Sequence, residues 1–286
     1  MSLLRAVFTM PNFCAYTLKA AKEVWYRADP NENHPGACSE RVCDGEQEAK
    51  AQAMQDFLGR VGVRRDVVFS EKGGVLSSQA KGTNIFTGGD AAVLEPPGFS
   101  DVDAEARQWT VKHEISHIKH SDVFAWSSLG AATHLVLGVF AMYSSLPFVP
   151  AVFLANLGGS AVASLFLIWR EAKADDFAIE HGTDEELKGG RRFLMVARQL
   201  NVIERTLSPF NNIRFSSEGE DRVDLAHPSF ASRIRKIEQA LSARGIDLRT
   251  LASQEEEDKI KKLGEFFFEE KYFKNLGDNC EPVPEL

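Results

Sequence analysis

Two histidines four residues apart flank a glutamate in the segment HEISH, residues 113–117. Residues four apart share one face of an α-helix, so the imidazoles of His113 and His117 can reach one zinc ion at about 2.0–2.1 Å. Glu114 lies beside them and has the chemistry of a general base toward water on that ion. Composition alone produces this pattern on the order of once per hundred chains of this size, so two surface histidines are the alternative interpretation.

A catalytic zinc ion takes a third protein ligand and keeps a fourth position open. One known solution places a histidine six residues after His117, but that residue is Val123. Glu171 and Asp175 offer the other solution, because they are one helical turn apart. One carboxylate can bind the metal while the other hydrogen-bonds a ligand histidine. The alternative for Glu171 is an ordinary surface charge next to Lys173.

A further histidine, His227, precedes Pro228 at the start of a segment with helical character that contains Arg233. A histidine held near the metal can donate to the oxyanion that develops during attack on an amide. A capping residue before a proline at the first helical position is an equal alternative. His120 lies three residues, about one helical turn, beyond His117, and we expect it at the surface or behind the ligands.

The 47 residues from Val123 to Trp169 contain no Lys, Arg, Asp or Glu. A membrane-spanning helix needs about 20 mostly apolar residues, so this length predicts two spans and a turn at Pro147 and Pro150. Within this segment, we expect His134 to form an interhelical hydrogen bond rather than to bind metal. A hairpin buried inside a soluble protein is the alternative to a transmembrane hairpin.

Basic residues flank both ends of this apolar segment, with Lys112 and Lys119 before it and Arg170 and Lys173 after it. Both ends are therefore expected on the same, cytoplasm-like side of a membrane, with an organelle membrane left open as the compartment. A hairpin that leaves and returns to one interface brings Glu171 back beside the two histidines.

The rest of the chain predicts a mainly helical α+β protein. Valine, isoleucine and phenylalanine alternate with glycines between residues 61 and 94, which predicts a few short strands. We expect three parts: an N-terminal helical and linker region (1–60), a central domain with the apolar hairpin 123–169 (61–245), and a C-terminal amphipathic helix and tail (246–286). The net charge of −8 argues against a nucleic-acid partner. The four cysteines form no CxxC pair, and free thiols or a Cys38–Cys43 disulfide remain open.

Taken together, these motifs resemble those of the integral-membrane gluzincin peptidases typified by the protease HtpX and the type I CAAX prenyl protease. HEISHIKHSD resembles the zinc helix of that family, EAKADDFA its third-ligand motif, HPSFASRI its C-terminal pattern, and TNIFTGG its glycine-rich strand. Order and spacing agree over about residues 60–240.

The resemblance implies a gluzincin-type catalytic domain with a small β-sheet and an inserted apolar hairpin. It implies one Zn²⁺ per chain held by His113, His117 and Glu171, with Glu114 as the base. It also implies Asp175 behind the ligands, His227 with Arg233 supporting the oxyanion, and a strand at Asn84 and Phe86 that aligns a protein or peptide substrate.

The resulting hypothesis is a zinc metalloendopeptidase that acts on membrane or membrane-proximal proteins, with the lipid bilayer as a second partner. A catalytically silent, zinc-stabilised membrane scaffold that binds client proteins is the alternative from another class. A soluble peptidase with its apolar hairpin folded inward is a second alternative.

Overall fold

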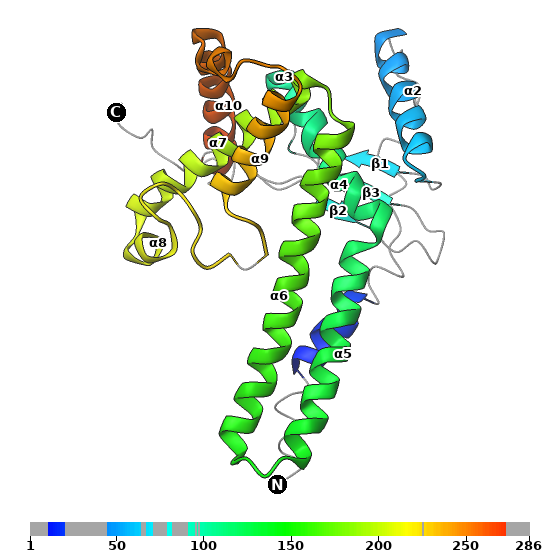
Figure 1. The fold of residues 1–286 in the computed structure, drawn as a ribbon, viewed down its shortest axis with the longest axis vertical. Helices are drawn as coiled ribbons and strands as arrows, with labels where there is room; N and C mark the ends of the chain where they lie inside the picture. The colour runs from blue at the N-terminus through cyan, green and yellow to red at the C-terminus, as the bar shows by residue number, and fades with distance from the viewer. Residues whose placement is uncertain are drawn as a thin grey trace, which may run out of the picture.

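The computed structural model describes residues 11–20, 45–63, 67–70, 79–81, 91–94, 96, 98–224 and 226–272. Besides a helix over residues 11–20, the helices are α2 (Gly45–Arg60), α3 (Phe99–Val102), α4 (Ala104–His120), α5 (Asp122–Tyr143), α6 (Phe148–His181), α7 (Asp184–Leu207), α8 (Pro209–Arg214), α9 (Phe230–Ala243), the 3-10 helix η1 (Leu248–Ala252) and α10 (Gln254–Tyr272). In Figure 1, α5 and α6 form a long hairpin that projects from a body made of the other elements.

The predicted α+β class is wrong, because the described chain is helical almost throughout and belongs to the α class. Strand residues are confined to β1 (Val67–Ser70), β2 (Gln79–Lys81) and β3 (Ala91–Leu94), in the order β1-β3-β2. β1 pairs with β3 in parallel and β2 pairs with β3 in antiparallel register. These short segments pack on one side of α4, and helix-to-helix contacts make up the rest of the core.

Helix α4, which carries the HEISH segment, is the central helix of the body and is buried over most of its length. Its N-cap is Asp103, whose side chain accepts a hydrogen bond from the amide of Ala106 at 2.8 Å. Arg192 on α7 donates to the same carboxylate at 2.7 and 3.0 Å, although the arginine side chain is only 1% exposed. The start of α4 is therefore held by a buried ion pair.

Helix α7 packs against α4 at very short range, and two adjacent glycines make this possible. A Cβ at Gly189 would lie 2.3 Å from the amide nitrogen of Ala106, and a Cβ at Gly190 would lie 2.4 Å from the Trp109 ring. Trp109 is almost fully buried, and its ring centroid lies 5.8 Å from that of His113. Packing by small residues thus fixes the α4 face that carries the histidines.

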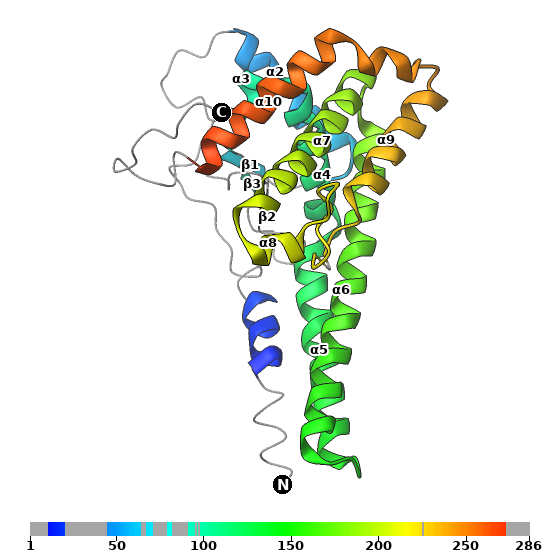
Figure 2. The same ribbon diagram turned by 90° about the vertical axis from the view of Figure 1, so that its left-hand side faces the viewer.

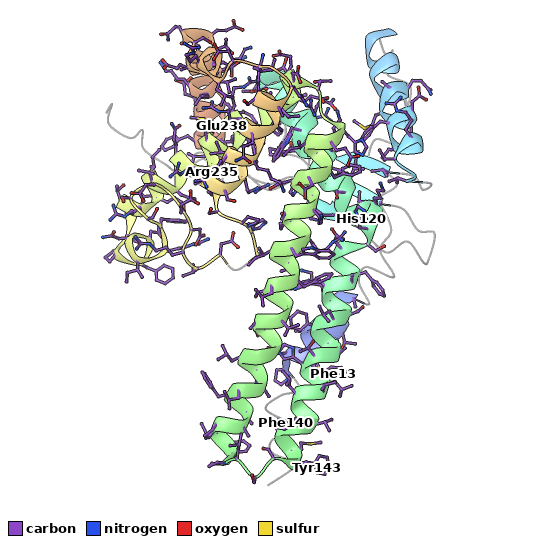
Figure 3. All side chains as sticks on the ribbon, viewed as in Figure 1. Phe13, His120, Phe140, Tyr143, Arg235 and Glu238 are labelled. Carbon is purple, nitrogen blue, oxygen red and sulfur yellow. The ribbon has the colours of Figure 1, made fainter. Side chains whose placement is uncertain are left out.

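The α5–α6 hairpin has its small residues inside and its large apolar residues outside. The interior positions include Ala141, Ala151, Ala155, Gly159 and Ala163. Phe140 and Tyr143, labelled in Figure 3, are exposed near the tip of the hairpin. Large exposed apolar side chains with small residues at the helix contact are the pattern of helices that face lipid. Both helices are long and apolar enough to cross a membrane.

The helix over residues 11–20 lies against this hairpin, as Figure 2 shows in blue. Asn12 donates to the side-chain oxygen of Asn156 on α6 at 2.8 Å. Tyr16 lies over Gly130 of α5, where an added Cβ would come within 2.5 Å of the tyrosine ring. The N-terminal helix is therefore a third element packed on the apolar hairpin.

Candidate metal site

Three predicted ligands converge in the body, directly above the apolar part of the hairpin. His113 and His117 face the same side of α4. Glu171 lies on α6, two residues after Trp169, just beyond the apolar part of that helix. The ligand atoms of these three residues all lie within 4.8 Å of one another. All three side chains are nearly buried, with only 8–12% of each exposed.

The separations between these ligand atoms fit a tetrahedral zinc ion. Nε2 of His113 lies 3.3 Å from Nε2 of His117 and 3.1 Å from Oε2 of Glu171, and Nε2 of His117 lies 3.4 Å from Oε1 of Glu171. A tetrahedron with metal–ligand bonds of about 2.0–2.1 Å has edges of about 3.3–3.4 Å. A Zn²⁺ ion bound here would therefore have three protein ligands and one position left for water or substrate.

An aspartate fixes the orientation of each imidazole. Nδ1 of His113 donates to Oδ1 of Asp175 at 3.0 Å, and Nδ1 of His117 donates to Oδ2 of Asp122 at 2.8 Å. Because ionised carboxylates only accept, each Nδ1 carries a proton, so each ring in its neutral, metal-binding form would turn its Nε2 lone pair toward the cluster. Three electron-rich atoms then face one another, an arrangement that a cation or a proton between them stabilises.

Each of these aspartates is paired in turn with an arginine. Arg233 on α9 donates to both oxygens of Asp175, at 2.8 Å each, and Arg170 on α6 forms an ion pair with Asp122. Asp175 and Asp122 are buried, so without these cations their charges would be costly. The structure thus contains two chains of the form Arg–Asp–His, one behind each histidine.

The electrostatics of the site are those of a cation-binding cluster. Burial alone lowers the pKa of His117, but hydrogen bonds to Asp122 and Glu171 outweigh it and raise that pKa to about 10. The pKa of His113 is raised in the same way, against its burial, by Asp175 and Glu171. Burial alone raises the pKa of Glu171, yet the two histidines hold it well below its ordinary value. Positive charge is therefore strongly favoured at this point.

The charge on Asp175 is equally well fixed. Its burial raises the pKa, but the charge of Arg233 and the hydrogen bond from His113 lower the pKa to about 2. The pKa of Arg233 is raised despite burial, chiefly by Asp175, with Glu171 and Glu114 adding to the effect. Both members of the pair remain ionised at neutral pH.

Glu114 stands next to His113 on α4 and is partly buried. Its negative charge contributes to the raised pKa of His117 and of Arg233, so the carboxylate lies near both side chains. Glu114 is therefore a carboxylate beside the candidate ligands that is not among the three converging residues.

His227 lies at the open side of the cluster, on the segment that leads into α9. Its Nε2 is 3.7 Å from Oε2 of Glu171, and its side chain is 46% exposed. Nδ1 of His227 donates to Oδ2 of Asp224 at 2.8 Å, and burial of the ring is outweighed by Asp224 and Glu171, so its pKa is raised. Because Nδ1 carries the proton donated to Asp224, only the imidazolium form of the ring, which Asp224 and Glu171 favour, presents Nε2–H toward the cluster.

Other predicted positions fall elsewhere. Asn84 and Phe86, expected to align substrate, lie outside the described residues, as do Cys38 and Cys43. His120 is exposed on α4, and its Nδ1 bonds to the carbonyl of Ser116.

The expectation for His134 is wrong. Its Nδ1 donates to the carbonyl of Gly130 on its own helix, and the ring fills the space above Gly159 on α6. A Cβ at Gly159 would lie 2.7 Å from the imidazole.

Sequence reasoning gave Asp122 only as the last residue of the zinc-helix motif and Arg170 only as a basic residue flanking the apolar segment, and it assigned no role to Asp224. Asp122 follows His117 by five residues, across the turn at Ser121, whose φ of 55° is left-handed. Helix periodicity does not extend across such a turn, so spacing alone gives no signal for this pair. An isolated Asp and an isolated Arg at the two ends of the uncharged segment are the only visible sign in the sequence.

No protein-family model, curated protein or solved structure matches this chain.

Proposed function

We propose that this chain is a membrane-embedded, zinc-dependent endopeptidase that belongs with the HtpX-like gluzincins its motifs resemble. The observation that carries the proposal is the convergence of two imidazole nitrogens and one carboxylate at separations of 3.1–3.4 Å, each imidazole backed by a buried aspartate. A zinc ion held there supplies Lewis-acid chemistry, polarising a peptide carbonyl and making water acidic enough to attack it.

We assign the steps of peptide hydrolysis to the residues around the ligands. Glu114 accepts a proton from the attacking water and passes it to the departing amine. His227, in its imidazolium form, would donate Nε2–H to the carbonyl oxygen as negative charge develops there, and Asp224 favours that form by accepting from Nδ1. Arg233 acts through Asp175 on His113 and does not touch the substrate.

The apolar hairpin supports a membrane location for this activity. Its outer surface is apolar and exposed, and its two ends meet in the body beside the metal ligands. We propose that α5 and α6 span the bilayer with the catalytic body on the cytoplasm-like side, following the basic residues that flank the apolar segment.

The decisive experiment compares wild type with Glu114→Gln, purified and loaded with zinc. The variant should bind one zinc per chain and lose casein cleavage by about 100-fold or more, because general acid–base transfer contributes on that order. Glu180→Gln, the same change at an exposed position of α6, is the matched control and should keep full activity. Equal cleavage by Glu114→Gln would refute the assigned base.

A zinc-stabilised scaffold predicts a different outcome, namely wild-type protein that holds zinc and melts at a higher temperature with it, but cleaves no substrate. The buried, charged environment that Glu114 shares with His117 and Arg233 argues for catalysis, since a scaffold has no use for that carboxylate.

A further inference from the structure

A second group of large apolar side chains is exposed on the body, away from the α5–α6 hairpin. It consists of Leu207 at the end of α7, Phe210 and Ile213 on α8, and Val223 in the loop that follows, and we call it the α8 patch. Phe210 and Ile213 are 69% and 72% exposed. Protein surfaces seldom gather several large apolar side chains in one place unless a partner covers them.

Helix α8 is held in place by hydrogen bonds and an ion pair with neighbouring segments of the chain. The Ser208 side chain caps the helix at the amide of Asn211, and the Asn211 side chain donates to the carbonyl of Glu204 on α7. Arg214 donates twice to Asp221, at 2.8 and 2.6 Å. The polar groups of this segment are satisfied within the protein while its apolar side chains face outward.

The position of α8 indicates what covers the patch. Figures 1 and 2 share their vertical axis, and in both α8 lies level with the start of α5, where the hairpin leaves the body. Trp169, half exposed, ends the apolar part of α6, and tryptophan is enriched where membrane helices meet the headgroups. A bilayer around the hairpin therefore has its headgroup region at the height of α8.

The charge beside the patch agrees with a lipid partner. Arg222 is exposed next to Val223, and Arg214 is partly exposed at the end of α8. Arginine side chains beside an apolar surface suit phosphate headgroups, which they contact while their carbon stems stay in the apolar layer.

We propose that the α8 patch inserts into the headgroup region of the bilayer that the hairpin spans, and so holds the metal site against the membrane surface. This rests on the proposed membrane insertion of the hairpin. The substrates that such a site reaches are extended segments that lie close to the membrane surface.

The patch is connected to the site through one loop. Asp221, which pairs with Arg214 of α8, also accepts from the amides of Val223 and Asp224. Asp224 in turn accepts from the amide and the Nδ1 of His227. Contact of the patch with lipid would therefore restrain the loop that positions His227.

Fluorescence quenching in phosphatidylcholine vesicles tests the location of the patch. Single cysteines at Ile213, Tyr143 and Ser242, in a full chain whose native cysteines are serines, carry an environment-sensitive fluorophore. Tyr143 at the hairpin tip is the inserted reference, and exposed Ser242 near the end of α9 is the solvent reference. Nitroxide-labelled lipid should quench the labels at 143 and 213, whereas iodide should quench only the label at 242.

Each other outcome overturns the proposal. Iodide quenching at 213 with lipid quenching at 143 means that the hairpin inserts and the patch does not. Quenching of the label at 213 by neither agent means that protein covers the patch. Absence of lipid quenching at 143 removes the membrane insertion on which the proposal rests.

A functional comparison uses the double variant Phe210→Ser/Ile213→Ser. It should cleave casein in detergent like wild type and cleave a vesicle-tethered peptide about tenfold more slowly, because membrane contact scales with buried apolar area. Leu248→Ser, an apolar-to-serine change on η1, is the control for lost surface hydrophobicity. Equal loss in both assays would contradict a membrane role for the patch. If even wild type cleaves nothing, the enzymatic proposal fails while the quenching result still decides the location of the patch.

Discussion

Replacement of Asp122 by asparagine should weaken zinc binding although Asp122 touches no metal. Its Oδ2 accepts from Nδ1 of His117 at 2.8 Å, and its carboxylate is paired with Arg170. The side chain of Asp122 is 5% exposed, so solvent does little to screen either interaction. Asparagine keeps the size of the side chain and one acceptor oxygen but removes the negative charge that makes His117 a stronger ligand.

The expected magnitude follows from these contacts. Partners that hydrogen-bond the far nitrogen of a ligand histidine typically contribute 10–100-fold to metal affinity. Asp122→Asn should lie near the lower limit, about tenfold or about 1.4 kcal/mol, because an acceptor remains. Asp122→Ala should lie near the upper limit, about 100-fold, because it removes the acceptor and leaves the buried guanidinium of Arg170 without its partner.

Competition with a chromophoric chelator at pH 7 measures the zinc affinity, and circular dichroism of the zinc-free protein checks that the fold is intact. Asp176→Asn is the matched control, since Asp176 is the half-exposed neighbour of Asp175 and its partners are surface lysines. If both Asp122 variants bind zinc as tightly as Asp176→Asn, the Arg170–Asp122–His117 chain has no part in metal binding.

Three further perturbations test the body, the hairpin and the protonation of the site. Arg192→Met should destabilise the protein by about 3–5 kcal/mol in urea unfolding, because Asp103 at the start of α4 is left buried and unpaired; an unchanged midpoint would contradict this. Gly159→Ala should lower the thermal midpoint more than Gly158→Ala does, since the added Cβ lies 2.7 Å from the His134 ring at the first site but 3.2 Å from a leucine methyl group at the second. Zinc binding should release protons, because the pKa of the His117 imidazole is raised to about 10. Below that pH, zinc affinity should rise about tenfold per pH unit for each proton displaced. Calorimetry in buffers of different ionisation enthalpy counts the released protons, and a binding heat that does not depend on the buffer would contradict this expectation.

The local parts of the site could be read from the sequence because they depend on one helical period. His113 and His117 share a face of α4 by spacing alone, and Glu171 and Asp175 share a face of α6 for the same reason. That Glu171 returns to the histidines followed from the length of the uncharged segment between them. The structure brings these residues together at hydrogen-bonding distances.

The parts that sequence could not supply depend on contacts across turns and between distant helices. Asp122 reaches His117 because the chain turns at Ser121, whose φ is left-handed, between α4 and α5. The packing of α7 on α4 depends on Gly189 and Gly190, which in sequence look like ordinary helix-weakening glycines. Neither effect has a periodic signature.

The fold class was predicted wrongly for a related reason. Alternation of Val, Ile and Phe between glycines indicated strands, yet the strands are only three or four residues long. Helices α4, α5, α6 and α9 supply the three candidate ligands and the Arg–Asp pairs behind them, and His227 and Asp224 lie on the loop that leads into α9. The prediction of an α+β class relied on this short strand pattern, although the long helical segments that follow it determine the fold class.

The two Arg–Asp–His chains also explain how an apolar hairpin can be placed between the candidate metal ligands while the ligands stay close together. Arg170 and Asp122 stand at the two bases of the hairpin, so their ion pair joins α6 to α5 at the point where both enter the body. The same Asp122 holds His117, and the helix that carries Arg170 carries Glu171 at the next position. Any change in the angle between α5 and α6 must therefore strain this ion pair before it moves the ligands. This charge pair therefore connects the base of the hairpin directly to the candidate metal ligands.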